Sequence, residues 1–96
     1  MVVGKVVGTV VATQKNEKLQ GSKLLVVCQM DIAMRPTSTY AVAVDSVGAG
    51  YGEIVLCVSG SSARLTEVTK SMPVDTAIIA IVDTIEVEGK TTFQKH

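Results

Sequence analysis

Aromatic side chains and histidine are scarce in this sequence. Its 96 residues include two tyrosines, one phenylalanine, no tryptophan and a single histidine, His96. Domains that bind single-stranded nucleic acid stack the bases on aromatic side chains in a basic groove. Serine-type catalysis needs a positioned base, most often histidine, beside the nucleophile. The scarcity therefore argues against both of these functions.

An excess of charge and a long apolar run are also absent. Nine Lys and Arg residues balance nine Asp and Glu residues, with an isoelectric point near 6.5. This balance removes the electrostatic attraction that dominates binding to nucleic acids and anionic membranes. The longest apolar run, Ala77–Val82, is far shorter than the roughly 20 residues that span a bilayer. Because the amino terminus also lacks the zones of a signal peptide, we expect a soluble cytosolic protein with no nucleic-acid or membrane partner.

The sequence offers no set of metal ligands. Cys28 and Cys57 both lie in apolar, strand-like runs, where a free thiol behaves as a small hydrophobic group. We expect both thiols to be reduced and buried. Two cysteines and His96 do not make the four ligands of a structural zinc site, so no metal is predicted.

Catalytic and cofactor-binding groups are equally hard to find. Asp45, Asp75 and Asp83 stand apart among apolar or small neighbours, without the paired carboxylate that acid–base hydrolysis uses. The glycines of residues 48–52 resemble half of a dinucleotide fingerprint, but a strand-like segment follows them where that motif requires a helix. We expect no catalytic residue and no cofactor, and interpret the glycines as a tight connection between strands.

β-branched residues are abundant: 17 Val, 6 Ile and 10 Thr make up about a third of the chain. Such residues favour strands, so the composition predicts an all-β domain covering residues 1–96. Alternation and turn residues predict five strands and a short helical turn that Ser61 or Ser62 caps. The expected strands are 2–13, 23–30, 39–47, 53–59 and 77–87, the helical turn is 63–68, and residues 31–38 are a loop because Pro36 lacks the N–H that a central strand needs. Gly89 is expected to turn the chain into a short return through residues 91–93.

Five strands and one helical turn in a chain of this length suggest a small five-stranded Greek-key barrel of the OB type, with a β-sandwich as the alternative. Gly4 and Gly8 inside the first strand indicate strong coiling or a close approach of two backbones. Residues 24–28 and 77–82 are apolar on both faces. A barrel wall in water should alternate apolar and polar residues, so we expect another subunit to cover these strands.

Three segments together resemble the EutN/CcmL-type vertex proteins of bacterial microcompartments. They are GKVVGTVVATQKNEKLQGSKLLVV at 4–27, AVAVDSVGAGYGEIVLCVSGSSAR at 41–64 and PVDTAIIAIVDTIEV at 73–87. The most specific part is the pattern D-x-V-G-A-G-x-G-E followed by G-S-S-A-R. The resemblance covers nearly the whole chain in register.

The resemblance implies an OB-like barrel that assembles into a cyclic homo-pentamer in the shell of a cytoplasmic microcompartment. There it would meet hexameric microcompartment shell proteins and cap a vertex. By motif, the residues at the subunit interface or fivefold axis would be Gly48, Gly50, Gly52, Glu53, Gly60, Ser61, Ser62, Ala63 and Arg64. Arg64 would reach a neighbouring subunit, with Glu53 among the candidate acceptors. An OB-fold ligand- or nucleic-acid-binding module remains the alternative function.

Overall fold

The structure is a computed structural model that describes residues 1–13, 15–67, 69 and 75–95. The described part is built from β-strands joined by loops and two short 3-10 turns. The strands are β1 (Val2–Val10), β2 (Leu24–Met30), β3 (Pro36–Asp45), β4 (Ile54–Ser59), β5 (Thr76–Ile81), β6 (Thr84–Val87) and β7 (Lys90–Gln94); the turns are η1 (Glu17–Leu19) and η2 (Gly60–Arg64).

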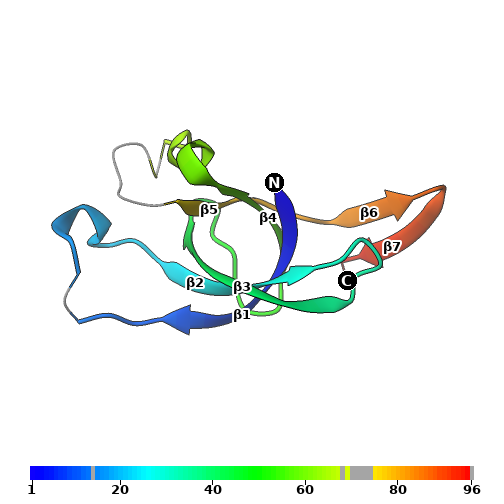
Figure 1. Ribbon diagram of the computed structural model, residues 1–96, viewed down its shortest axis with the longest axis horizontal. Helices are drawn as coiled ribbons and strands as arrows, with labels where there is room; N and C mark the ends of the chain where they lie inside the picture. Colours follow the sequence, from blue (N-terminus) through cyan, green and yellow to red (C-terminus); the bar gives the residue numbers. More distant parts are fainter. Residues whose placement is uncertain (14, 68, 70–74, 96) are drawn as a thin grey trace.

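Five of the strands close into a barrel in the order β1-β2-β3-β5-β4 (Figure 1). β1 pairs with both β2 and β4, and these ladders are antiparallel, as are β2–β3 and β4–β5. The exception is β3–β5, a short parallel pairing at the end of β3. The expected all-β, five-stranded barrel is confirmed.

The core lies inside the barrel and comes from alternate residues of its strands. Val6, Leu25, Val55 and Ile78 are each almost fully buried, since period-two alternation points them all inward. Gly4 confirms the expected close approach of two backbones: a Cβ at this position would overlap Cγ1 of Val27 and lie 3.3 Å from the carbonyl oxygen of Cys28. A small residue here lets β1 curl between β2 and β4.

Both cysteines are free and buried, as expected. The Sγ atom of Cys28 lies 3.4 Å from the carbonyl oxygen of Thr37. Burial raises the pKa of the Cys57 thiol to about 11, because a low-dielectric environment disfavours the thiolate.

Three strand predictions were wrong at their boundaries. The first strand ends at Val10 and not at residue 13, and the third ends at Asp45 and not at Val47. β3 begins at Pro36 and not at Thr39, because a proline is tolerated as the first residue of a strand, where its missing N–H breaks no inner ladder bond. Residues 77–87 form two strands and not one. Val82 and Asp83 separate β5 from β6, and β6 leaves the barrel to pair with β7.

The helical turn also differs from its prediction. η2 is a 3-10 turn over Gly60–Arg64, directly after β4, whereas a turn at 63–68 was expected. Gly60 starts it with a φ of 66°, a conformation that glycine adopts without strain. Val68 lies outside the described residues.

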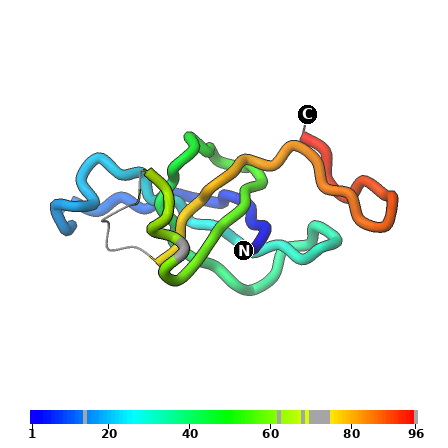
Figure 2. Tube along the Cα trace, turned by 90° about the horizontal axis from the view of Figure 1, so that it is seen from above, coloured from blue at the N-terminus to red at the C-terminus, as the bar shows by residue number. Residues whose placement is uncertain are grey.

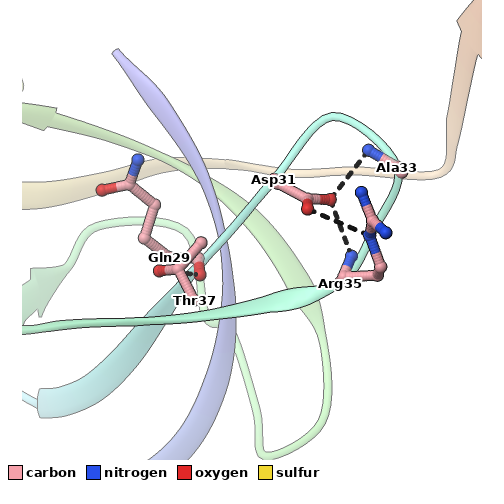
Figure 3. A network of polar contacts seen from close by, with 5 residues as sticks. All are labelled: Gln29, Asp31, Ala33, Arg35 and Thr37. Carbon is pink, nitrogen blue, oxygen red and sulfur yellow. Dashed lines mark hydrogen bonds and ion pairs between the residues drawn. The ribbon is translucent and has the colours of Figure 1, made fainter.

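A carboxylate organises the turn between β2 and β3 (Figure 3). Asp31 accepts hydrogen bonds from the backbone N–H groups of Ala33 and Arg35 and from Nε of Arg35, at 2.9 to 3.2 Å. The backbone N–H of Arg35 is the main reason that the pKa of Asp31 lies below its ordinary value. Beyond the turn, the Thr37 hydroxyl donates to the carbonyl oxygen of Gln29 at 2.7 Å. The turn is therefore held in one shape.

Strands β6 and β7 form a separate two-stranded sheet that projects from the barrel (Figures 1 and 2). Glu88 and Gly89 both have positive φ at its turn, as a tight type I′ connection requires. The expected return after Gly89 is confirmed, as an arm that lengthens the molecule to 45 Å against 24 and 23 Å.

Candidate subunit interface

The connector between β3 and β4 is a compact turn and not a flexible link. The carboxylate of Asp45 accepts the backbone N–H groups of Val47 and Gly48, at 3.0 and 3.1 Å. Gly48 then takes a φ of 80° and Gly52 a φ of 85°, the left-handed region that favours glycine. Gly50 has no positive φ, so its backbone conformation does not require a glycine.

Hydrogen bonds from both backbone and side chains tie this connector to the barrel. The Ser46 hydroxyl donates to the carbonyl oxygen of Ile78 at 2.6 Å. Gly52 N–H donates to Val6 O at 2.8 Å, and Lys23 Nζ donates to Ala49 O at 2.7 Å. Since Ala49 itself is fully buried, the connector is part of the barrel's packed end.

Glu53 closes the connector and binds it to the C-terminal arm. Its Oε1 accepts Gly50 N–H at 2.8 Å, and its Oε2 accepts Lys95 Nζ at 2.8 Å. The bond from Lys95, followed by the one from Gly50, holds the pKa of Glu53 below its ordinary value. Both carboxylate oxygens thus have partners within the chain, so Glu53 is not a free acceptor waiting for Arg64. No local pattern predicts this ion pair, because Lys95 is 42 residues away from Glu53 in the sequence.

η2 presents a different surface. Ala63 is fully buried, while Gly60, Ser61 and Arg64 are exposed and Ser62 belongs to the same turn. Close by, the Thr66 and Thr69 hydroxyl oxygens lie 2.6 Å apart. Arg64 is the last residue of this turn and is exposed.

The two predicted groups of site residues do not meet within one chain. Gly48, Gly50, Gly52 and Glu53 precede β4, whereas residues 60–64 follow it. A strand of this length separates its ends by roughly 20 Å. Only a contact between two subunits, head to tail, could bring the connector of one against η2 of the next.

Apolar side chains remain on the outside of the barrel. Tyr40 and Val42 on β3 are 60% and 51% exposed, and Tyr51 and Leu65, near the two ends of β4, are exposed by more than 80%. On β2, Leu24 and Val26 are half-buried on the outer face. The segments expected to need a cover, residues 24–28 and 77–82, are instead buried or half-buried within the chain itself. The exposed apolar surface of the barrel wall lies on β3, at Tyr40 and Val42, and a surface of this kind is typical of a subunit contact.

The described residues hold no cluster of three or more His, Cys, Asp or Glu side chains that could bind a metal ion. In the same part of the chain, no helix combines the length and apolar character needed to cross a lipid bilayer.

Comparison with known proteins gives consistent matches. The family described as "Ethanolamine utilisation protein EutN/carboxysome" matches residues 1–83. The bacterial microcompartment shell vertex protein GrpN of Rhodospirillum rubrum is 50% identical over 90% of this chain and 97% of its own length. A GrpN structure, described as a pentameric microcompartment shell protein, has a TM-score of 0.81 at 49% identity and covers 91% of this chain and 98% of that chain.

The structure of CcmL from Nostoc sp. is more similar still in fold. Its TM-score is 0.95 at 46% identity, and the match covers 99% of this chain and 100% of that one. Sequence identity of this level over nearly the whole chain shows common family membership, and not only a common barrel fold. The chain belongs to the EutN/CcmL family of microcompartment shell vertex proteins.

Proposed function

We propose that five copies of this chain form a closed ring that caps a vertex of a polyhedral microcompartment shell in the bacterial cytoplasm. The observation that carries the proposal is the barrel wall, which leaves Tyr40 and Val42 exposed in a small, otherwise well-packed domain. The kinship with GrpN, whose structure is described as pentameric, supports five as the number of subunits.

The ring is held by a head-to-tail interface. Such an interface joins two different surfaces and closes when its rotation divides a full circle. The connector of one subunit, with Gly48, Gly50, Gly52 and Glu53, and η2 of the next, with Gly60, Ser61, Ser62, Ala63 and Arg64, are the two surfaces we assign to it. Their positions at opposite ends of β4 suit this arrangement.

The function is geometric and not enzymatic. A flat layer of hexagonal tiles needs pentagonal units to close into a shell, so a pentamer among hexameric shell proteins supplies curvature and seals the corner. The rigid connector and the buried Ala63 keep the interface in a single shape. Supplying curvature and sealing a corner need no catalytic residue, metal or cofactor.

Shell closure tests this function directly. Hexameric shell proteins are expressed with and without this chain, and the particles are examined by electron microscopy. We expect closed polyhedra with the chain and particles with open corners without it. Equally closed particles in both samples would contradict the vertex role.

Arg64 tests the interface assignment. Because arginine supplies a planar, five-donor fork, Arg64→Ala should raise the concentration at which the ring dissociates by at least about tenfold, and Arg64→Lys should rescue only part of that loss. Arg35→Ala is the matched control, since Arg35 pairs with Asp31 of its own chain. Equal effects of the Arg64 and Arg35 variants in native mass spectrometry would remove Arg64 from the interface.

A further inference from the structure

The Glu53 carboxylate joins two segments that lie far apart in the sequence. Its Oε1 accepts the backbone N–H of Gly50, and its Oε2 accepts Nζ of Lys95, each at 2.8 Å. Gly50 belongs to the connector, which we assign to the subunit contact, whereas Lys95 directly follows β7. Hydrogen bonds to an ionised acceptor are roughly twice as strong as bonds to a neutral one. Loss of this single charge would therefore weaken both bonds at once.

The middle of the connector rests on this carboxylate. Asp45 holds only the first turn, through the backbone N–H groups of Val47 and Gly48. At Gly50 the contact is with Glu53, because a Cβ built on this glycine would lie 3.5 Å from Oε1. Gly50 also has no positive φ. Its conformation therefore depends on the hydrogen bond to Glu53 and not on a special backbone geometry.

Positive groups keep Glu53 ionised. The hydrogen bond from Lys95 is the largest cause of its lowered pKa, and the bond from Gly50 N–H is the next. The charge of Lys23, which precedes β2, acts in the same direction. Lys23 also donates Nζ to the carbonyl oxygen of Ala49 at 2.7 Å, so it stays beside the connector when Glu53 changes its charge.

Two other titratable residues lie near this junction. Tyr51 lines the same surface groove as Glu53, but a phenol carries no charge in acid. Asp83 acts on Lys95, whose pKa is raised chiefly by its bond to Glu53 and slightly by Asp83. Of the two carboxylates, only Glu53 accepts a bond from the connector, and Asp83 supplies a control.

We propose that Glu53 is an acid-sensitive latch: while ionised it holds the connector in the shape that the subunit contact uses, and its protonation loosens the ring. This inference rests on the proposed ring and on the connector as one of its surfaces. Because the folded-state pKa of Glu53 is lowered, the latch is complete above the ordinary carboxyl pKa and is lost as the pH falls through the lowered value.

The barrel should stay folded while the ring loosens. Among the described residues, the buried polar or charged side chain is that of Thr69, so no carboxylate is buried in this part of the chain. Acid denaturation mostly requires the protonation of carboxylates that are paired or hydrogen-bonded in the native state. The apolar core of the barrel offers none, so acid should act first on the connector.

The acid dissociation of the ring tests the proposal. Sedimentation velocity at constant ionic strength follows the ring from about pH 7 to about pH 3, and circular dichroism follows the barrel. We expect the parent ring to dissociate in acid while the barrel spectrum persists. Glu53→Gln, a neutral replacement of equal shape, should raise the dissociation concentration at pH 7 at least about threefold and should flatten the acid profile.

A Glu53→Gln ring as tight as the parent ring, with the same acid profile, would overturn the latch and leave the ring standing. A parent protein that is monomeric at neutral pH would instead overturn the ring itself.

Lys95→Met gives a second test that a merely structural role would not pass. This variant keeps the Glu53 carboxylate but removes the main cause of its lowered pKa. The midpoint of acid dissociation should therefore move to higher pH, whereas a simple structural defect would weaken the ring at every pH alike. Asp83→Asn is the matched control and should leave the midpoint in place.

An unchanged midpoint in Lys95→Met, or an equal shift in Asp83→Asn, would contradict the proposal. Should Glu53→Gln fail to fold, the midpoint of Lys95→Met decides.

Discussion

Lys95 donates a 2.8 Å hydrogen bond to Glu53 across 42 residues of sequence. The bond joins the end of the C-terminal arm to the connector that precedes β4. Glu53 also holds Gly50 N–H, so one carboxylate fixes the connector's turn and the base of the arm together. Tyr51, Glu53, Phe93 and Lys95 line the surface groove between these two segments. A residue of the predicted interface, Glu53, thus contacts the base of the arm directly.

Replacing Lys95 by methionine should loosen the arm and spare the barrel. Lys95 is 45% exposed and its partner 24%, and pairs this accessible to water contribute little to global stability. We expect amide exchange in β6 and β7 to speed up severalfold while exchange in β1 to β5 stays the same. Uniform acceleration over the whole chain would show that the ion pair supports the barrel instead.

The same pair predicts a dependence on pH. Hydrogen bonds from Lys95 and Gly50 lower the pKa of Glu53, so its contribution is present above the ordinary carboxyl pKa and is lost as the pH falls through the lowered value. The hydrogen bond to Glu53 raises the pKa of Lys95. Lys95 therefore stays charged near neutral pH, and the ion pair is kept there. Acidification should speed exchange in the arm of the parent, and much less so in Lys95→Met. Parallel acid profiles of the two proteins would argue against the pair as the cause.

Gly4→Ala should destabilise the barrel. The added Cβ overlaps Cγ1 of Val27 and makes a tight contact of 3.3 Å with the carbonyl oxygen of Cys28. Forcing a methyl group into a packed wall costs about 1 to 3 kcal/mol. Gly8→Ala is the matched control, because its nearest atom, Cβ of Val26, lies at an ordinary 3.8 Å. Urea unfolding of both variants gives the comparison, and equal midpoints would refute the tight approach at Gly4.

The connector glycines should respond differently to alanine. Gly48 has a φ of 80°, whereas Gly50 does not have a positive φ and a Cβ there would only touch Oε1 of Glu53 at 3.5 Å. Gly48→Ala should therefore lower the free energy of unfolding by about 1 kcal/mol, and Gly50→Ala by much less. Thermal unfolding of the pair measures the difference. If Gly50→Ala were the more costly, its role would lie in the subunit contact and not in the turn.

The thiols should resist labelling in the folded protein. Burial raises the pKa of Cys57 to about 11, and Cys28 is buried as well. The species that attacks a maleimide is an accessible thiolate, which neither residue supplies in the folded protein. We expect maleimide to modify both cysteines in denaturant and neither within minutes under native conditions. Thr91→Cys, at an exposed position of β7, supplies the reactive control. Rapid native labelling of Cys57 would contradict its place in the core.

Much of the barrel could be predicted from the sequence. The alternation of apolar and polar residues and the positions of glycines depend on neighbouring residues in the chain. The burial of Leu25 and Val27 follows from alternation within a single strand. The close approach at Gly4 involves only two neighbouring strands. The start of β3 at Pro36 and the break at Val82 could not be predicted, since both depend on which strand lies beside them. Proline is harmless where no inner ladder bond is lost.

The candidate site also has features that the local sequence predicts and features that only the fold shows. The motifs located the connector and η2, and the glycine at Gly48 does take the positive φ that a tight connection requires. Their separation by the whole of β4 is a property of the fold, as is the bond between Glu53 and Lys95. Contacts between residues so far apart in sequence leave no mark on local composition.

The number of subunits in the ring can be measured by native mass spectrometry of the unmodified chain at micromolar concentration. We expect one dominant species with five times the mass of the 10.1 kDa chain, and no stable folded monomer. A folded monomer, or a ring with a different number of subunits, would contradict it.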